Sequence, residues 1–385
     1  MKKTVFTLLM FLIVPVFAEM VLTGNGKTLN KCSDRSITTA VIPDGVETIA
    51  SAAFYGCEYL VQITIPASVR HIRNLAFQKC SSLTLDIPVT VTEIEEGAFQ
   101  DVRRVNIAPD HPRYTATAQG AVIDRQSGKL LYVPPEVTGV FRIPRNIRRI
   151  GKYAFYNCSL LTAVIFTAEV KSIGEYAFQK CSGLERITLV NGLEVIGEWA
   201  FAGCENLRNI TIPASVKTIG SAAFFNVPRI ALSAQNRHFR LTSEGSLIEP
   251  GRKRFIYCPP GRDRCTIPEN IQVIDDLAFA FCAGLKRIII PASVRIIGNS
   301  AFYACENLER VDIPAGVRRI EKYAFLGCSK LERVIVRGPA VICEGAFGRG
   351  CYEKNLTKAY ICRQARIHRD AFPEWCEIVR RDFNN

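Results

Sequence analysis

The sequence predicts one long repeat solenoid with short parallel strands, and three observations lead to this prediction. The dipeptide Ala-Phe recurs every 22 or 23 residues within each block, a longer apolar pattern surrounds each copy, and hydrophobic residues make up 48% of the chain. Such self-similarity is typical of coils that contact only their neighbours and share one continuous core. The copies begin at Ala53, Ala76, Ala98, Ala154, Ala177, Ala200, Ala223, Ala278, Ala301, Ala324, Ala346 and Ala371.

Each coil is expected to open with a short strand. The aligned repeats read Leu-x-x-Ile-x-Ile-Pro-x-x-Val-x-x-Ile-x-x-x-Ala-Phe-x-x-Cys, as around Ile63-Thr-Ile65. The Ile-x-Ile step has the β-branched residues and the period of two that favour a strand. The proline that follows, such as Pro66, ends the strand because it cannot donate to the ladder of the next coil.

The remaining positions of the repeat return the chain to the core. Valine and isoleucine three residues apart, such as Val69 and Ile72, turn inward again, and Ala-Phe closes the coil. Phenylalanines of successive coils are expected to stack, since aromatic rings pack well in offset pairs. The parallel strands should lie about 4.8 Å apart and form one concave face, opposite a convex wall of turns.

The repeat is interrupted twice, near residues 103–140 and 229–265, and the two interruptions match each other. Tyr132-Val-Pro-Pro135 corresponds to Tyr257-Cys-Pro-Pro260, and each interruption suggests a hairpin followed by a coil. The matching blocks indicate duplication of a set of coils. The expected organisation is a signal peptide over 1–18, a solenoid over 19–347 with these interruptions, and a C-terminal cap over 348–385.

The N-terminus has the features of an export signal. Lys2 and Lys3 precede an apolar run from Val5 to Phe17, and Ala18 is a small residue at the expected cleavage point. The run is too short to span a bilayer, and no later segment approaches the needed length. We therefore expect a secreted, periplasmic or cell-surface protein without a transmembrane segment in the mature chain.

The pattern Leu-x-x-Ile-x-Ile-Pro…Ala-Phe…Cys, which covers about residues 37–347, resembles the BspA-type, or treponemal-type, leucine-rich repeat family of bacterial surface and secreted proteins. The resemblance implies an α/β-type repeat solenoid: a right-handed, arc-shaped leucine-rich repeat array with few regular helices. It also implies a role in adhesion to, or recognition of, host or microbial partners. The family assigns no catalytic residues, so none are carried over.

Most of the fifteen cysteines follow the repeat. A cysteine at one place in every coil indicates a small buried hydrophobe rather than half of a disulfide. These ladder cysteines are Cys57, Cys80, Cys158, Cys181, Cys204, Cys282, Cys305 and Cys328. Outside the ladder, Cys258 and Cys265 are a disulfide candidate, and further bridges are possible among Cys343, Cys351, Cys362 and Cys376; the connectivity does not follow from the sequence.

The sequence offers no catalytic, metal or cofactor motif. The four histidines, His71, His111, His238 and His368, lie in different coils without metal-ligand spacing. No phosphate-binding glycine loop, nucleophile elbow or His-Glu-x-x-His helix is present. We therefore expect no enzymatic activity, no metal and no cofactor.

The formal net charge of +13 favours anionic partners, and export argues against nucleic acid among them. The second x of Leu-x-x-Ile should point away from the core, onto the concave face, and six arginines fall there: Arg104, Arg186, Arg229, Arg287, Arg310 and Arg333. Two interpretations stay open. The arginines form ion pairs with neighbouring acids such as Glu185, Glu309 and Glu332, or they present planar donors to carboxylate, sulfate or phosphate groups of a partner.

The sequence favours a protein that recognises a macromolecule, either an acidic protein or a polyanionic glycan of a host or a neighbouring microbe. The alternative is a structural or self-associating scaffold of the cell envelope without a soluble ligand. Sedimentation distinguishes the two, because a scaffold should form oligomers without an added partner. The oligomeric state itself does not follow from the sequence.

Overall fold

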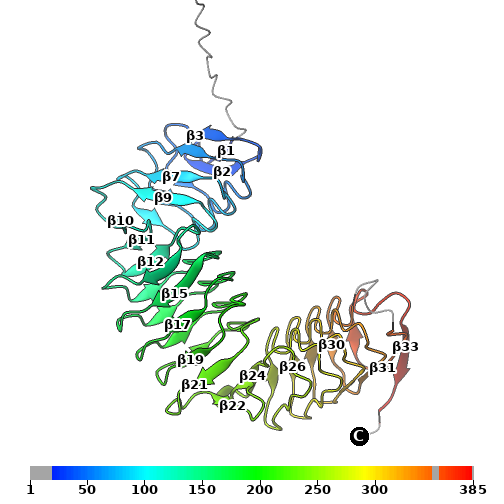
Figure 1. Cartoon of the computed structure of the whole chain (residues 1–385). Coiled ribbons are helices and arrows are strands. Elements are labelled where there is room, and N and C mark those ends of the chain that lie inside the picture. Colours follow the sequence, from blue (N-terminus) through cyan, green and yellow to red (C-terminus); the bar gives the residue numbers. More distant parts are fainter. Residues whose placement is uncertain (1–19, 349–354, 384–385) are drawn as a thin grey trace, which may run out of the picture. The chain divides into compact units, whose positions relative to one another are not determined.

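The computed structural model describes residues 20–348 and 355–383 and divides the chain into two compact units, Met1–Val122 and Ile123–Asn385. In both units the chain winds in successive coils whose strands stack in register, so the fold is a parallel β-solenoid (Figure 1). One 3₁₀ helix, η1 (Pro250–Arg252), is the only helical element among the described residues. The expected signal peptide and Cys351 lie outside the described residues.

Unit 1 contains two stacks of strands. The Ile-x-Ile segments form one four-stranded parallel sheet, and the Val-x-x-Ile segments form a second sheet of short strands, which an antiparallel β1–β2 pair extends at its edge. The first sheet comprises β3 (Thr39–Val41), β5 (Gln62–Thr64), β7 (Thr84–Ile87) and β9 (Arg104–Ile107). The second comprises β1 (Met20–Thr23), β2 (Thr28–Cys32), β4 (Thr48–Ile49), β6 (His71–Ile72) and β8 (Glu93–Ile94), and β10 (Tyr114–Ala116) follows β9 along the chain.

Unit 2 repeats the same arrangement. Its Ile-x-Ile strands are β13 (Gly139–Arg142), β15 (Leu161–Ile165) and β17 (Arg186–Thr188); β19 (Ile210–Ile212) and β21 (Ile230–Leu232); and β27 (Arg310–Ile313), β29 (Arg333–Val336), β31 (Lys358–Cys362) and β33 (Glu377–Arg381). The short strands β14 (Arg149–Ile150), β16 (Ser172–Ile173), β18 (Val195–Ile196) and β20 (Thr218–Ile219) continue from β11 (Val122–Asp124) and β12 (Lys129–Tyr132).

The second interruption of the repeat folds as an antiparallel meander that rejoins the array. Strand β23 pairs antiparallel with β22 and β24, and β24 then pairs parallel with β25. The chain thus returns to coil geometry without leaving the sheet. This sheet comprises β22 (Arg240–Leu241), β23 (Leu247–Glu249), β24 (Arg254–Tyr257), β25 (Val273–Ile274), β26 (Ile296–Ile297), β28 (Arg319–Ile320), β30 (Val341–Ile342) and β32 (Arg366–Ile367).

The Ala-Phe residues form the expected core. Every Ala-Phe phenylalanine is buried, and consecutive rings stack face to face, with centroids 4.8 Å apart for Phe302–Phe325 and 4.5 Å apart for Phe155–Phe178. Phe141 and Phe255 contact the next phenylalanine where the interruptions rejoin the array. The ladder is thus the element that ties each coil to the next within a unit.

In several coils of unit 2, glycine occupies the corner that follows the second strand. A Cβ added to Gly174 would lie 2.8 Å from the backbone carbon of Gly151 in the preceding coil. Such a contact is far inside van der Waals distance, so the backbones of adjacent coils touch at this corner. Asp275 occupies the equivalent corner after the second meander and places a carboxylate inside the fold.

The array extends beyond the boundary expected at residue 347. The ring of Phe372 stacks on Phe347 with centroids 4.7 Å apart, and β33 pairs in parallel with β31 through Arg381. Leu356, Ala359 and Ile361 are fully buried. The described residues after 347 therefore form further strands of the solenoid, which cover its last phenylalanine.

Candidate partner-binding face

The candidate site is the strand face, by which we mean the side of the Ile-x-Ile strands that points away from the core. Successive residues of a strand point to opposite sides, so the residue before the first isoleucine and the residue between the two isoleucines share this face. In β27, Arg310 and Asp312 are exposed, whereas Val311 and Ile313 are buried. The expected orientation of the arginine position is therefore confirmed for this strand.

Three of the six predicted arginines lie side by side. Arg287 pairs in parallel register with Arg310, and Arg310 with Arg333. Lys358 follows Arg333 in the same register, so the column holds four basic residues on consecutive coils. Stacked strands lie about 4.8 Å apart, so the column spans three such steps.

The other three arginines are exposed but do not continue this column. Arg104 belongs to unit 1, where its register neighbour is Thr84. Arg186 is in register with Ala163, and the backbone carbonyl of Arg229 accepts a hydrogen bond from Ile210 in a separate two-stranded sheet. The six arginines therefore form no single uninterrupted column, because the Ile-x-Ile strands belong to separate sheets and residues such as Thr84 and Ala163 interrupt the basic position.

The arginines of the column lack acidic partners. Among the described residues, neither Arg287 nor Arg310 forms an ion pair, and Glu309 and Glu332 form none with them. Arg333 instead lies over the ring of Tyr360, with its guanidinium carbon 5.3 Å from the ring centroid. The interpretation in which neighbouring glutamates neutralise this column therefore does not describe the structure.

Two residues at the end of the column escaped prediction. Lys358 forms an ion pair with Glu377 at 2.9 Å. Arg381 also lies over the ring of Tyr360, with its guanidinium carbon 4.5 Å from the ring centroid. The segment Leu356-Thr-Lys-Ala-Tyr-Ile361 fits the repeat if Ala359 replaces the first isoleucine, and this signal could have identified Lys358. Nothing in the repeat marks Arg381, which depends on the pairing of the last strand.

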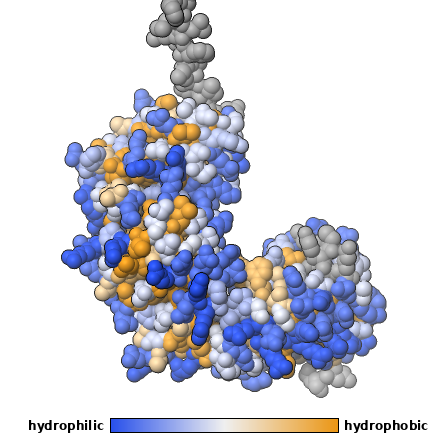
Figure 2. Space-filling model, in the orientation of Figure 1, coloured by the Kyte–Doolittle hydropathy of each residue, from blue (hydrophilic) through white to orange (hydrophobic). Residues whose placement is uncertain are grey.

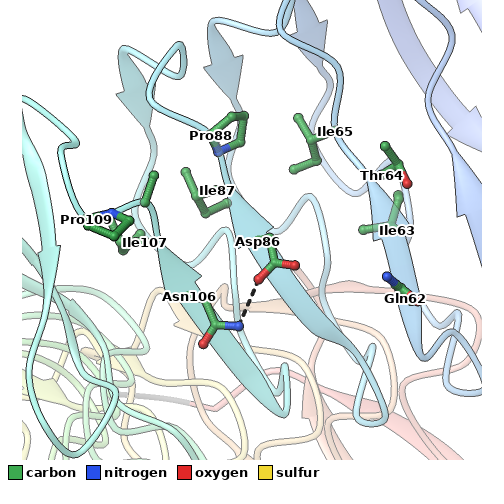
Figure 3. A pocket seen from close by; sticks show the side chains of 11 residues that line it. Gln62, Ile63, Thr64, Ile65, Asp86, Ile87, Pro88, Asn106, Ile107 and Pro109 are labelled. Atoms are coloured by element: carbon green, nitrogen blue, oxygen red, sulfur yellow. Dashed lines mark hydrogen bonds between the residues drawn. The ribbon is translucent and has the colours of Figure 1, made fainter.

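The strand face of unit 1 differs in charge. A shallow cavity of about 410 Å³ opens there between Gln62, Thr64, Asp86 and Asn106 (Figure 3). Asn106 donates a hydrogen bond of 2.8 Å to Asp86 across adjacent strands. Isoleucine, proline and alanine side chains complete the lining, so this cavity is largely apolar and contains one carboxylate but no basic group.

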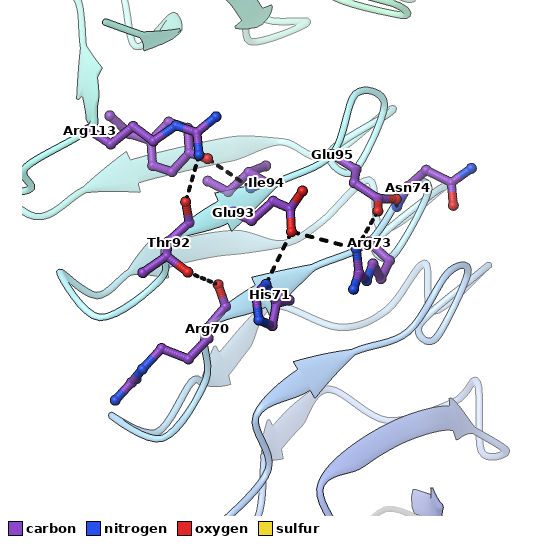
Figure 4. A network of polar contacts seen from close by, with 10 residues as sticks. Arg70, His71, Arg73, Asn74, Thr92, Glu93, Ile94, Glu95 and Arg113 are labelled. Carbon is purple, nitrogen blue, oxygen red and sulfur yellow. Dashed lines mark hydrogen bonds and ion pairs between the residues drawn. The ribbon is translucent and has the colours of Figure 1, made fainter. Parts of the chain in front are cut away.

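Charged residues elsewhere in unit 1 neutralise one another. On β6 and β8, His71 lies 3.2 Å from Glu93, and Arg73 pairs with Glu93 and, at 2.7 Å, with Glu95 (Figure 4). The hydrogen bond from Arg73 to Glu95 raises the pKa of that guanidinium. Such ion pairs form readily between adjacent coils. Arg287 and Arg310, which have none among the described residues, therefore differ from these neutralised charges of unit 1.

The ladder cysteines are buried thiols. Every cysteine among the described residues is free, and the Cys305 thiol donates to the carbonyl of Phe279 at 3.1 Å, as equivalent thiols do in other coils. Burial raises the pKa of Cys80 to about 12 and that of Cys204 well above the usual range. Cys258 and Cys265 are adjacent free thiols, and Cys265 lies 3.2 Å from the hydroxyl of Ser246.

We expect the ladder thiols to resist maleimide in the folded protein, because the thiolate is the reactive species and both burial and the raised pKa suppress it. Labelling followed by peptide mass mapping, before and after denaturation, measures this protection. Replacing the exposed Ser81 by cysteine provides a matched control beside buried Cys80. Equal labelling of residues 80 and 81 in the folded state would contradict the burial of the ladder.

The described residues contain no group of three histidine, cysteine or acidic side chains placed to hold a metal ion. Within the same ranges, no helix has the length and apolar character needed to cross a membrane. The chemistry that the strand face offers is therefore that of guanidinium, ammonium and aromatic groups on a rigid sheet.

Short parallel strands, an aromatic ladder and almost no helix define a β-solenoid of the leucine-rich repeat type. The family model described as "BspA type Leucine rich repeat region" matches residues 29–111, 138–236 and 251–378 in six copies. These ranges cover most of the chain, which therefore belongs to the BspA-type leucine-rich repeat family. The resemblance seen in the sequence is confirmed.

Solved structures of bacterial proteins show the same fold. A leucine-rich cell surface protein of Faecalibacterium prausnitzii is similar over 94% of this chain and 85% of its own, with 24% identity and a TM-score of 0.52. A leucine-rich repeat protein of Eubacterium ventriosum is similar over 92% of this chain and 78% of its own, with 18% identity and a TM-score of 0.50. No curated protein matches the chain.

Proposed function

We propose that this protein is a secreted or surface-associated recognition protein, without catalytic activity, that binds an acidic macromolecule of a host or neighbouring microbe through the strand face of its last coils. The observation that supports this proposal is the column of Arg287, Arg310 and Arg333, in which the first two have no ion-pair partner among the described residues. Membership of a family of bacterial surface proteins supports an exported adhesin rather than an enzyme.

The arrangement has an electrostatic cost that a partner would remove. Two unit charges about 5 Å apart in water repel by about 0.8 kcal/mol, and this separation lies inside the screening length of about 8 Å at physiological salt. An anion bridging two guanidinium groups would replace this repulsion by charge-assisted hydrogen bonds. Arginine suits such contacts because its planar fork matches carboxylate and sulfate groups.

Replacing Arg287, Arg310 and Arg333 together by glutamate is expected to weaken binding to polyglutamate and to heparin by about 100-fold or more, since each lost contact and added repulsion together cost at least about 1 kcal/mol. The dependence of affinity on salt should flatten at the same time. Biolayer interferometry across a salt series measures both effects, and circular dichroism verifies the fold.

The matched control replaces Arg295, Arg318 and Arg366 by glutamate. These exposed arginines belong to the same part of unit 2 but lie off the strand face, and the charge change is identical. Equal loss in both triple variants would show a non-specific response to net charge and would reject the strand face as the site. Oligomers formed by the parent protein without any probe would instead favour the envelope scaffold.

A further inference from the structure

A row of apolar side chains runs beside the basic column on the strand face. Ile335, Tyr360 and Val379 are half-buried and in register on adjacent strands, and the first two each lie between two core-facing residues. Ile289 has the equivalent place in the Ile288-Ile289-Ile290 segment, next to the bridge residue Arg287. Ile289 lies between buried Ile288 and Ile290, and 81% of its own surface is exposed, the largest value among the large hydrophobic residues that are exposed. The face of the last coils that Figure 2 shows is largely hydrophilic.

The two rows are parallel and adjacent. Residues two apart on a strand lie on the same face, roughly 7 Å from each other. Ile335 thus lies beside Arg333, and Ile289 beside Arg287. Asp312 is the one acidic residue of the apolar row, and Arg337 neutralises it through two hydrogen bonds, of 2.7 Å from Nε and 2.5 Å from a terminal nitrogen.

Tyr360 fixes the basic groups around it. The guanidinium groups of Arg333 and Arg381 lie over its ring, at 5.3 Å and 4.5 Å from the centroid. Cation–π contacts of this kind restrain long side chains before any ligand arrives, which lowers the entropy lost when the arginines bind a carboxylate. The end of the column is therefore partly organised for binding.

We propose, building on the function proposed above, that the partner is an acidic protein segment carrying apolar side chains and not a polyanionic glycan. A glycan with sulfate or carboxylate groups would satisfy the arginines but would leave Ile289 and Ile335 without apolar contacts. A protein segment with both acidic and apolar side chains would satisfy both rows. Covering an exposed aliphatic side chain of this size contributes up to about 1.5–3 kcal/mol.

Three probes distinguish the partner classes: a peptide of glutamate and leucine, a peptide of equal length and charge made of glutamate and serine, and heparin. The glutamate–leucine peptide is expected to bind the full chain at least 10-fold more tightly than the glutamate–serine peptide. The double variant Ile289→Ser with Ile335→Ser should remove this difference without affecting the glutamate–serine peptide. The control variant, Leu160→Ser with Val195→Ser, changes exposed apolar residues of other coils and should preserve the difference.

The outcomes separate this inference from the proposed function. If all three probes bind in an arginine-dependent manner but leucine adds nothing, the apolar row has no role and the inference is overturned, while the basic recognition face stands. If heparin alone binds, the partner is a glycan and the inference is likewise overturned. If no anionic probe binds, both the inference and the proposed function are wrong.

Discussion

Deleting residues 348–385 is expected to convert the protein into an aggregating species. The cut removes β31 and β33, and with them the ring of Phe372 that covers Phe347. Three large side chains of the deleted segment, Leu356, Ile361 and Phe372, are buried, and at about 2 kcal/mol each their loss removes roughly 6 kcal/mol of apolar burial. That amount is comparable with the whole stability of an ordinary domain.

The deletion also creates a new sheet edge. Strand β29 would lose its neighbour β31 and expose a row of unpaired backbone groups above an uncovered aromatic ring. Such an edge is a template for pairing with another chain. Aggregation, rather than partial unfolding of one unit, is therefore the expected result.

Light scattering coupled to size exclusion, together with dye binding to exposed apolar surface, measures this outcome. The control deletes residues 306–328, which is one whole coil from within the array. That variant loses at least as much core but keeps the original last strands, so it should remain a monodisperse, folded protein. A folded, monomeric 1–347 fragment would show that the last coils do not cap the solenoid.

The repeating part of the fold could be predicted because its physics is local. A given position of the repeat has the same burial in successive coils. The sequence alone therefore placed Arg310 on the exposed side of its strand. The column of Arg287, Arg310 and Arg333 followed from the same register. Lys358 was within reach of this reasoning, since alanine can replace isoleucine at the first inward position.

What could not be predicted depends on contacts that do not repeat. The solenoid boundary was expected at residue 347, because the Ala-Phe copy at Ala371 follows after a longer spacing, and only the pairing of β33 with β31 reveals the additional strand. The breaks between the sheets, which separate Arg186 and Arg229 from the basic column, likewise arise where the chain departs from the repeat. The ion-pair network of the second meander is partly of this kind. Glu249 and Arg254 correspond to Asp124 and Lys129 of the first interruption, but Asp275 replaces Gly151 of the matching coil.

That network is the subject of the second prediction. Arg254 bridges two buried carboxylates: a terminal nitrogen lies 2.9 Å from Glu249, and Nε donates to Asp275 at 3.0 Å while the second terminal nitrogen also contacts Asp275. Only 17% of the Arg254 side chain is exposed, against 7% for Glu249 and 3% for Asp275. Arg254 also reaches the carbonyl of Ile219 at 3.4 Å and so ties the meander to the preceding coil.

Replacing Arg254 by methionine is expected to lower the free energy of unfolding at neutral pH by about 3 kcal/mol or more. Methionine retains the apolar stem but leaves two carboxylates without their partner, and removing one member of a buried ion pair costs about 3–5 kcal/mol. Urea unfolding followed by circular dichroism measures the change. The control Arg252→Met removes an exposed arginine that pairs with the same Glu249, and should cost less than about 1 kcal/mol.

The loss should depend on pH in a defined direction. Burial already raises the pKa of Asp275 in the folded protein, and removing Arg254 should raise it further. A carboxyl whose pKa is higher in the folded than in the unfolded state favours folding when protonated, so its contribution grows as the pH falls through the folded pKa and is complete below the unfolded value of about 3.9. The stability deficit of Arg254→Met relative to the parent should therefore shrink on mild acidification, whereas that of Arg252→Met should stay nearly constant. A deficit that is independent of pH would show that Arg254 acts through packing against β20 and not through the carboxylates.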